Sequence, residues 1–323
     1  MAVPAKYRRL TSFADYFSGK KVAPVLTIFV GGNHEASSHL SALPYGGWVA
    51  QNIFYLGWAG VVNYGGLRIG GISGIYKSHD FEKGHFEKKP FDEGTVRSIY
   101  HQRHWDTYRL ALLDPSTKLD IFISHDWPCG ITKFGDEGLL LQSKPFFADD
   151  IARNQLGSPA LSTLLRVLQP KYWFAGHLHV KFAALVRHDS DNQVLTKFLA
   201  LDKCESRRHY LQFVEFPAVS TGAAHELQFD EEWMKIVKLT HPSLPDAKIC
   251  SQSAYAVQKE DVAQMAMTLL PSALCVPPLT MPELQTLQIL ENLQLVAPAG
   301  DIGTCTSLGA PNEEEIEIDL DMD

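Results

Sequence analysis

Three short apolar segments lie far apart in the sequence. Each is followed by a small residue and then by side chains of the types that bind metals. The segments span residues 25–30, 119–123 and 172–175, and they are rich in the β-branched and aromatic residues that favour strands. The polar side chains that follow them are Asn33, His34, His125, His177 and His179. Sites in α/β sheets form at the carboxyl ends of strands, so three such endings can converge. This feature predicts an α/β domain with a ligand site at one sheet edge.

Further segments complete an α/β pattern in which helices separate strands and part of the sheet is antiparallel. The hairpin signal Gly65-Gly66 joins two of the predicted strands. Besides the three above, the predicted strands are residues 61–64, 67–69, 180–186, 194–201 and 210–216. The predicted helices are residues 96–113 and 158–168, with two more helical patterns near 257–270 and 284–295.

The residue types at the three endings favour a metal centre with nitrogen and oxygen ligands. His177 and His179 stand two apart, and in an extended backbone this spacing sends both imidazoles to one face. Together with His125 and the side-chain carbonyl of Asn33, they suit Mn, Fe or Zn. The side chain of His34 should diverge from that of Asn33 and face a substrate. Alone, the first motif is typical of a turn and the second of a capped strand end, whereas the third fits a metal site as well as an ordinary strand ending. The three in this order favour the metal site.

The acidic charge of the chain sits mainly at its end. The formal net charge is −8, and residues 313–323 carry seven acidic and no basic side chains. Removing those seven charges leaves −1 for residues 1–312, so the body of the chain does not exclude a polyanionic partner. The five cysteines are few and scattered, which fits a reducing compartment. No apolar run reaches the roughly 18–20 residues that a membrane span needs, so no membrane association is expected.

The motifs Gly31-Gly32-Asn33-His34-Glu35, Ser124-His125-Asp126 and Gly176-His177-Leu178-His179 resemble the later part of the calcineurin-like metallophosphoesterase signature. Longer segments are very similar to one family of that superfamily, the RNA lariat debranching enzymes. These segments are residues 28–35, 73–80, 97–101, 124–128, 175–184 and 196–204. The similarity extends from near residue 2 to about residue 240.

This resemblance implies a layered metallophosphoesterase β-sandwich flanked by helices, followed by a small helical C-terminal region. It implies hydrolysis of the 2′–5′ phosphodiester bond at the branch point of excised intron lariat RNA, within mRNA splicing and intron turnover. Branched RNA is therefore the expected partner and the nucleus the expected location, whereas protein partners are not indicated. Asn33, His125 and His177 would ligate one divalent metal, His179 would contribute to a second, and His34 would be the general acid.

The resemblance also implies a division of the chain. Residues 1–224 would form the metallophosphoesterase domain with a lariat recognition loop at about 73–103, residues 225–296 a C-terminal domain, and residues 297–323 a disordered acidic tail. Aromatic and charged residues alternate in and just after the loop, a pattern that suits stacking of splayed nucleotides, although an ordinary surface loop remains the alternative. The candidate RNA-binding residues of the loop are Tyr76, Lys77, His79, Arg97 and Tyr100.

Two motifs of the family do not precede Asn33: a D-x-H or C-x-H after the first strand and a G-D after the second. The chain thus resembles a family member without its opening strand–helix–strand unit and its metal-bridging aspartate. We expect impaired hydrolysis, because the second metal would keep only His179. Three explanations are open. The chain is the product of an internal start codon or of an incomplete gene model, it is an isoform that binds lariat RNA without cleaving it, or another group replaces the aspartate. A metallophosphatase acting on proteins or nucleotides is a further one.

Overall fold

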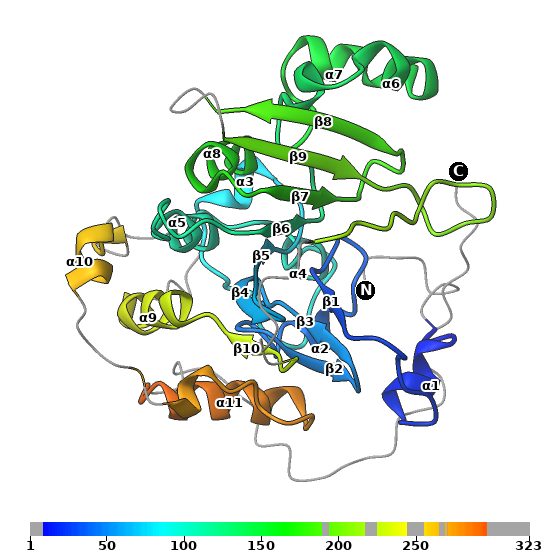
Figure 1. Ribbon diagram of the computed structural model, residues 1–323. Helices are drawn as coiled ribbons and strands as arrows, with labels where there is room; N and C mark the ends of the chain where they lie inside the picture. The colour runs from blue at the N-terminus through cyan, green and yellow to red at the C-terminus, as the bar shows by residue number, and fades with distance from the viewer. Residues whose placement is uncertain are drawn as a thin grey trace.

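The computed structural model describes residues 9–188, 194–216, 225–243, 255–264, 269 and 271–295, which form a mixed α/β fold (Figure 1). In this part of the chain a larger sheet has the strand order β10-β4-β5-β6-β7-β9-β8, and a smaller one has the order β1-β3-β2. Helices lie around the large sheet, as the predicted fold class requires. No helix within the described ranges combines the length and apolarity that a membrane crossing requires.

The elements have the following bounds. The strands are β1 Thr27–Phe29, β2 Gly47–Ala50, β3 Ile53–Tyr55, β4 Ala59–Tyr64, β5 Leu67–Ile72, β6 Ile121–Ser124, β7 Tyr172–Ala175, β8 Phe182–Arg187, β9 Leu195–Ala200 and β10 Gln228–Phe229. The α-helices are α1 Phe13–Phe17, α2 Ser37–Leu40, α3 Ser78–Phe81, α4 Thr95–Ser98, α5 His104–Ala111, α6 Glu137–Ser143, α7 Ala148–Ala152, α8 Pro159–Leu168, α9 Glu231–Thr240, α10 Lys259–Gln264 and α11 Pro282–Asn292. The 3₁₀ helices are η2 Ile131–Phe134, η3 Pro145–Phe147, η4 His241–Ser243 and η6 Pro271–Leu274.

The strands β5, β6, β7 and β9 run parallel to one another in the middle of the large sheet. Their register places Ile72 beside Ser124 and Ala175 beside Ala200, so the four strands end at the same edge. The segments that follow them leave the sheet together. This parallel alignment confirms the expectation that the motifs after residues 119–123 and 172–175 converge.

The small sheet packs closely against the large one at a glycine. A Cβ atom at Gly71 in β5 would lie 2.9 Å from the side chains of Val30 and Leu56, which follow β1 and β3. The absence of a side chain at Gly71 therefore lets the two sheets approach. The backbone N–H of Gly74 donates to the carbonyl of Gly31 at 2.7 Å, which brings the ending of β1 to the same edge.

The helices cover the sheets with apolar faces and polar caps. The side chain of Ser158 accepts a hydrogen bond from the N–H of Leu161 at the start of α8, and Pro159 occupies the first turn. Helix α11 lies against the small sheet, where the Gln285 side chain accepts from the N–H of Trp48 at 2.8 Å and donates to its carbonyl at 3.0 Å. These bonds occupy backbone groups of β2 that a free sheet edge would expose.

Two predicted elements are wrong. The single helix expected over 96–113 is broken into α4 and α5, because the backbone between them pairs with Ile75. The N–H of Ile75 donates to the Tyr100 carbonyl, and the carbonyl of Ile75 accepts from the N–H of Gln102. Residues 210–216 form no strand, because both sides of β9 are occupied and the outer edge of β8 is bridged at Ala184. The predicted tail, 297–323, lies outside the described residues, and the division into domains stays a prediction.

A polar contact in the large sheet generates a stability prediction. The Arg68 guanidinium in β5 donates to both Asp230 carboxylate oxygens at 2.7 and 2.8 Å and to Glu232 at 2.7 Å, and Asp230 also caps α9. We expect Arg68→Ala to lower the free energy of unfolding by about 3 kcal/mol, because it leaves two largely buried carboxylates without their cation. Urea unfolding measures this loss.

The matched control is Arg153→Ala, which removes an exposed ion pair to Asp150 and should change the free energy of unfolding by less than about 1 kcal/mol. Equal effects of the two substitutions would contradict the prediction.

Candidate metal centre

Three strand endings meet at the carboxyl edge of the large sheet. Asn33 follows β1, His125 follows β6 and His177 follows β7. The Asn33 Oδ1 atom lies 3.0 Å from Nε2 of His125, and the rings of His125 and His177 are 4.8 Å apart between centroids. The structure therefore brings three of the predicted ligands together, although the sequence separates the outer two by more than one hundred residues.

The position of the His125 ring depends on a glycine in the first motif. A Cβ atom at Gly32 would lie 2.7–3.0 Å from three atoms of that ring, which is closer than real contacts permit. The N–H of Gly32 donates to the Glu35 side chain at 2.9 Å, which closes the turn. Burial raises the pKa of the Glu35 carboxyl. The sequence pattern alone assigns Glu35 no role, although Glu35 ends the motif that contains Asn33 and His34.

The backbone of the third motif differs from the extended form expected from its spacing. His177 and His179 have φ values of 62° and 52°, in the left-handed region that residues other than glycine rarely adopt. The extended-strand reason for placing both imidazoles on one face is therefore wrong. The bend is held by the Gly176 N–H, which donates to the His125 carbonyl at 3.1 Å, and by the Trp127 indole, which donates to the Gly176 carbonyl at 2.7 Å. Such strained residues are concentrated at functional sites.

His125, His177 and His179 do not form one tight group of ligand atoms among the described residues. Among the described residues, the only group of three or more His, Cys, Asp or Glu whose ligand atoms all lie within 4.8 Å of one another is His79, Asp80 and His101. The nitrogens of His125, His177 and His179 are therefore not gathered that tightly. The assignment of His179 to a second metal stays a prediction.

The electrostatics of the centre favour metal binding. Burial, reinforced by neighbouring histidines, lowers the pKa of His125 to about 3. Burial and the positive charge of Lys77 lower the pKa of His177 to about 4. Both rings are therefore neutral at physiological pH, which is the form that ligates a metal. Two neutral imidazoles and an amide oxygen fit a divalent transition metal, whose identity the donor set leaves open.

His34 lies at the solvent-exposed side of the centre. Its Nε2 atom is 3.3 Å from Nδ2 of Asn33, whose Oδ1 atom is turned to His125. Asn33 thus contacts both histidines through opposite ends of one amide. The two neighbouring side chains, expected to diverge, therefore contact each other at their polar ends. That His34 faces a substrate stays a prediction, in keeping with its exposure to solvent.

The buried carboxyl group of Asp126 joins the second motif to the recognition loop. It accepts hydrogen bonds from the N–H of Tyr76 at 3.2 Å and of Trp127 at 2.8 Å. Burial raises the pKa of Asp126 to about 6. The sequence pattern alone does not reveal this role, although Asp126 directly follows His125 in the second motif.

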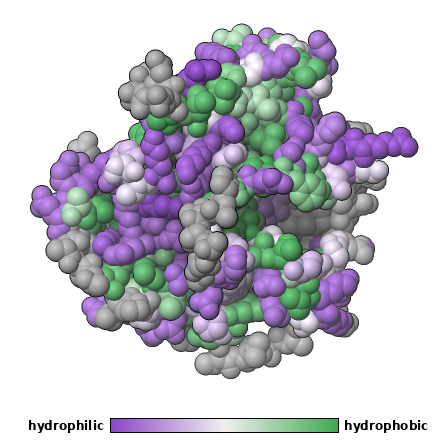
Figure 2. Space-filling view, in the orientation of Figure 1, coloured by the Kyte–Doolittle hydropathy of each residue, from purple (hydrophilic) through white to green (hydrophobic). Residues whose placement is uncertain are grey.

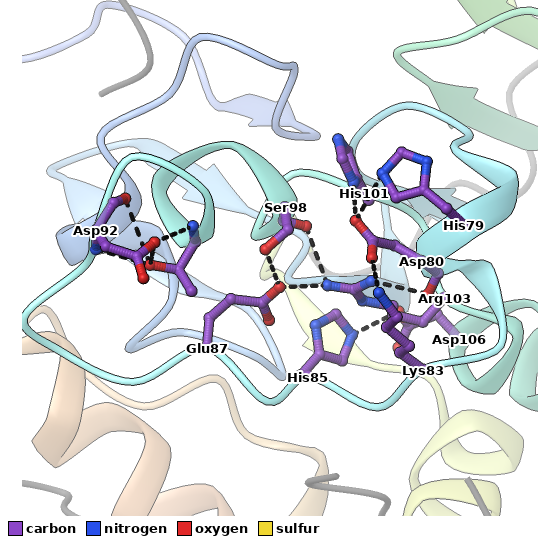
Figure 3. Close-up of polar contacts among 11 residues, drawn as sticks. His79, Asp80, Lys83, His85, Glu87, Asp92, Ser98, His101, Arg103 and Asp106 are labelled. Carbon is purple, nitrogen blue, oxygen red and sulfur yellow. Dashed lines mark hydrogen bonds and ion pairs between the residues drawn. The ribbon is translucent and has the colours of Figure 1, made fainter. Parts of the chain in front are cut away.

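A buried polar network gives the loop its shape (Figure 3). The Arg103 guanidinium pairs with Glu87 at 2.5 Å, and both side chains are almost completely buried, at 0% and 1% exposed. Arg103 also donates to the carbonyls of Asp80 and Ser98. The Asp80 carboxylate in turn accepts from Lys83, at 2.5 Å. Several charged groups of the loop are therefore used inside it.

The five RNA-binding candidates of the loop have different environments. Lys77, His79 and Arg97 are exposed, and Tyr76 packs on the ring of Phe81. Tyr100 is buried, its hydroxyl accepting from Ser37 and donating to the Glu35 carbonyl, so its ring supports the turn from inside. The RNA contacts themselves stay predictions.

The packing at Gly32 generates a metal-binding prediction. We expect Gly32→Ala to weaken binding of Mn²⁺ or Zn²⁺ by about 10- to 100-fold, because the new methyl group must push the His125 ring away from Asn33. Isothermal titration calorimetry measures the affinity. Gly94→Ala is the matched control, since its Cβ would contact only Asp92, at 3.3 Å. Unchanged metal affinity in Gly32→Ala would show that the ring need not hold this position.

The buried ion pair of the loop generates a second prediction. We expect Arg103→Met to lower the free energy of unfolding by about 3–5 kcal/mol, because it leaves the Glu87 carboxylate buried without the guanidinium that neutralises it. The double variant Arg103→Met/Glu87→Met should recover much of that loss, since no charge is left unpaired. Urea unfolding together with hydrogen exchange of residues 78–103 tests both. A double variant less stable than Arg103→Met would contradict this account.

Comparisons with known proteins agree with this geometry. The family model for calcineurin-like phosphoesterases matches residues 4–181, and the model for the lariat debranching enzyme C-terminal domain matches residues 193–308. The lariat debranching enzyme of Danio rerio is 55% identical over 243 residues, which are 74% of this chain and 42% of that protein. The human enzyme is 54% identical over 244 residues, 74% of this chain and 44% of that protein.

The lariat debranching enzyme of Drosophila pseudoobscura pseudoobscura aligns over 93% of this chain and 62% of its own length, at 44% identity. The chain thus spans less than half the length of the two vertebrate relatives. The phosphoesterase match covers more than half of the chain and contains Asn33, His125 and His177, the residues that converge at the sheet edge. The chain therefore belongs to the calcineurin-like phosphoesterases and, within them, to the lariat debranching enzyme family.

Proposed function

We propose that this chain recognises branched RNA and hydrolyses the 2′–5′ phosphodiester bond at its branch point. The observation that carries the proposal is the convergence of Asn33, His125 and His177, with His34 open to solvent beside them. The recognition loop is fastened to this centre through Asp126 and Tyr76. Relatives named lariat debranching enzymes support the choice of substrate.

The residues divide the work of this reaction. Asn33, His125 and His177 would hold one divalent metal and His179 would contribute to another, and such a metal supplies Lewis acidity beside the phosphate. His34 would donate a proton to the leaving 2′-oxygen. Lys77, which is exposed and close enough to lower the pKa of His177, would attract the phosphate.

The finer assignments are also proposals. Excised intron lariats are the proposed substrate, so the chain would act in intron turnover after mRNA splicing, in the nucleus where lariats are made. Mn, Fe or Zn would serve as the metal, because the ligands are nitrogen and oxygen atoms.

A second candidate function is binding of branched RNA without turnover. In the ranges that the structure describes, no Asp or Glu joins His125 and His177 in a group of three close ligands. A centre without a carboxylate carries less negative charge to hold two cations, which favours binding over hydrolysis.

A cleavage assay separates the two functions. We expect the chain with Mn²⁺ to release the 2′-linked arm of a synthetic branched RNA and to leave a linear 3′–5′ RNA intact. His34→Ala should slow release by about 10²- to 10⁴-fold, the usual contribution of a general acid. His225→Ala, an exposed histidine beside Tyr64, is the matched control.

Three outcomes are informative. Equal rates for the chain and His34→Ala would remove the catalytic role of His34. Retained binding of the branched RNA without cleavage would support the binding function. Cleavage that persists after chelation of all divalent metal would contradict the metal centre.

A further inference from the structure

Large aromatic side chains are exposed on two segments that flank His179. Phe146 in η3 is 69% exposed, and Phe213 in the loop 201–216 is 84% exposed. In and just after the recognition loop, by contrast, Tyr100 is 8% and Trp105 is 0% exposed. The other aromatic residues of the loop are half-buried, so the most exposed aromatic rings among the described residues lie outside it.

The order of strands puts these two segments on the far side of the metal centre from the recognition loop. The recognition loop follows β5, and the metal ligands follow β6 and β7, which come next in the sheet. The loop 201–216 follows β9, the strand after β7. Beyond it lies β8, whose outer edge is bridged at Ala184 by Gly135, in the segment that leads to α6 and η3.

The loop 201–216 is fastened to the segment that carries His179. The Arg208 guanidinium donates to the His179 carbonyl at 3.3 Å and to Asp202 at 2.9 Å. Two residues after His179, the Lys181 ammonium donates to the Gln212 side chain at 3.1 Å. Phe213, the next residue, is therefore carried on a loop that is tied to the segment 179–181.

The segment η3 presents a cation together with an aromatic ring. Phe147 is buried and packs edge-on against Phe146, with ring centroids 4.7 Å apart. This contact holds the exposed Phe146 ring in place. The Lys144 ammonium lies 5.7 Å from the centre of the Phe146 ring. Lys144 directly precedes η3, and Lys203 lies in the loop 201–216 that Arg208 ties to the His179 carbonyl, so both segments carry a cation as well as an exposed ring.

This combination is the chemistry of a surface for single-stranded nucleic acid, in which cations follow phosphates and aromatic rings stack on bases. Figure 2 shows hydrophilic and hydrophobic side chains interspersed at the top of the molecule, where α6 and α7 lie. We propose that Lys144 and Phe146, together with Lys203, Arg208 and Phe213, form a binding surface for a single-stranded RNA segment. The surface rests on the proposed function for its biological role, because it would hold one arm that leaves the branch point.

Binding of an unbranched RNA tests the surface without requiring catalysis. A fluorescein-labelled ten-nucleotide oligouridylate is titrated with the whole chain, and affinity is measured by fluorescence anisotropy at several salt concentrations. We expect Phe146→Ala and Phe213→Ala each to weaken binding by about 5- to 100-fold, the usual range for one stacked base. Lys144→Ala should reduce the slope of log affinity against log salt by about 0.7, the value for one phosphate contact of a single strand.

Matched controls lie elsewhere on the molecule. Phe17→Ala removes a ring that is 50% exposed in α1, and Lys171→Ala removes an exposed lysine at the opposite end of β7. Both should bind the RNA as the parent chain does. Phe146→Tyr should keep the affinity and Phe146→Leu should not, which separates stacking from a general loss of apolar volume.

The results separate this surface from the proposed function. Parental affinity in Phe146→Ala and Phe213→Ala would overturn the surface even if branched RNA is cleaved. Weakened oligouridylate binding in these variants, in a chain that cleaves no branched RNA, would support the surface while the proposed hydrolysis fails. Equal losses in Phe17→Ala and Phe146→Ala would also overturn it, since they would show nonspecific adhesion.

Discussion

The parallel pairing of β6 between β5 and β7 is the constraint on which the metal centre depends. Parallel strands of matched register end together, so residues from distant parts of the chain leave the sheet at one edge. The small sheet adds Asn33 to that edge only because Gly71 lets Val30 and Leu56 pack against β5. A bulkier side chain at Gly71 would move β1 outward and separate Asn33 from His125.

The centre is assembled as a set of neutral donors before any metal binds. Burial lowers the pKa of His125 and His177, so neither ring must lose a proton near neutral pH when a cation arrives. The Asn33 amide directs its oxygen to His125 and its nitrogen to His34, which separates the ligand face from the substrate face. One uncharged side chain thereby orients two histidines that have different proposed tasks.

Local sequence patterns anticipated the elements that local forces determine. The strand 172–175, the turn at Gly65-Gly66 and the helix after Ser158 appear as predicted, since periodicity and capping specify them. The break between α4 and α5 was missed, because it depends on pairing with Ile75, which lies more than twenty residues away. The convergence of the ligands was predictable from strand endings, whereas the left-handed bend at His177 was not, because it depends on contacts across the sheet edge.

The location of charge, rather than its sum, decides where a polyanion can approach this chain. In the recognition loop, Arg103 pairs with Glu87 and Lys83 pairs with Asp80. These two positive charges therefore stabilise the loop and are not available to a polyanion. The cations near the histidines of the centre come instead from separate segments. The positive charge of Lys77 lowers the pKa of His177, and that of Lys144 lowers the pKa of His179. A phosphate at the centre would therefore lie between positive charges although the chain as a whole is acidic, because nearby charges act on it more strongly than the net charge of the chain does.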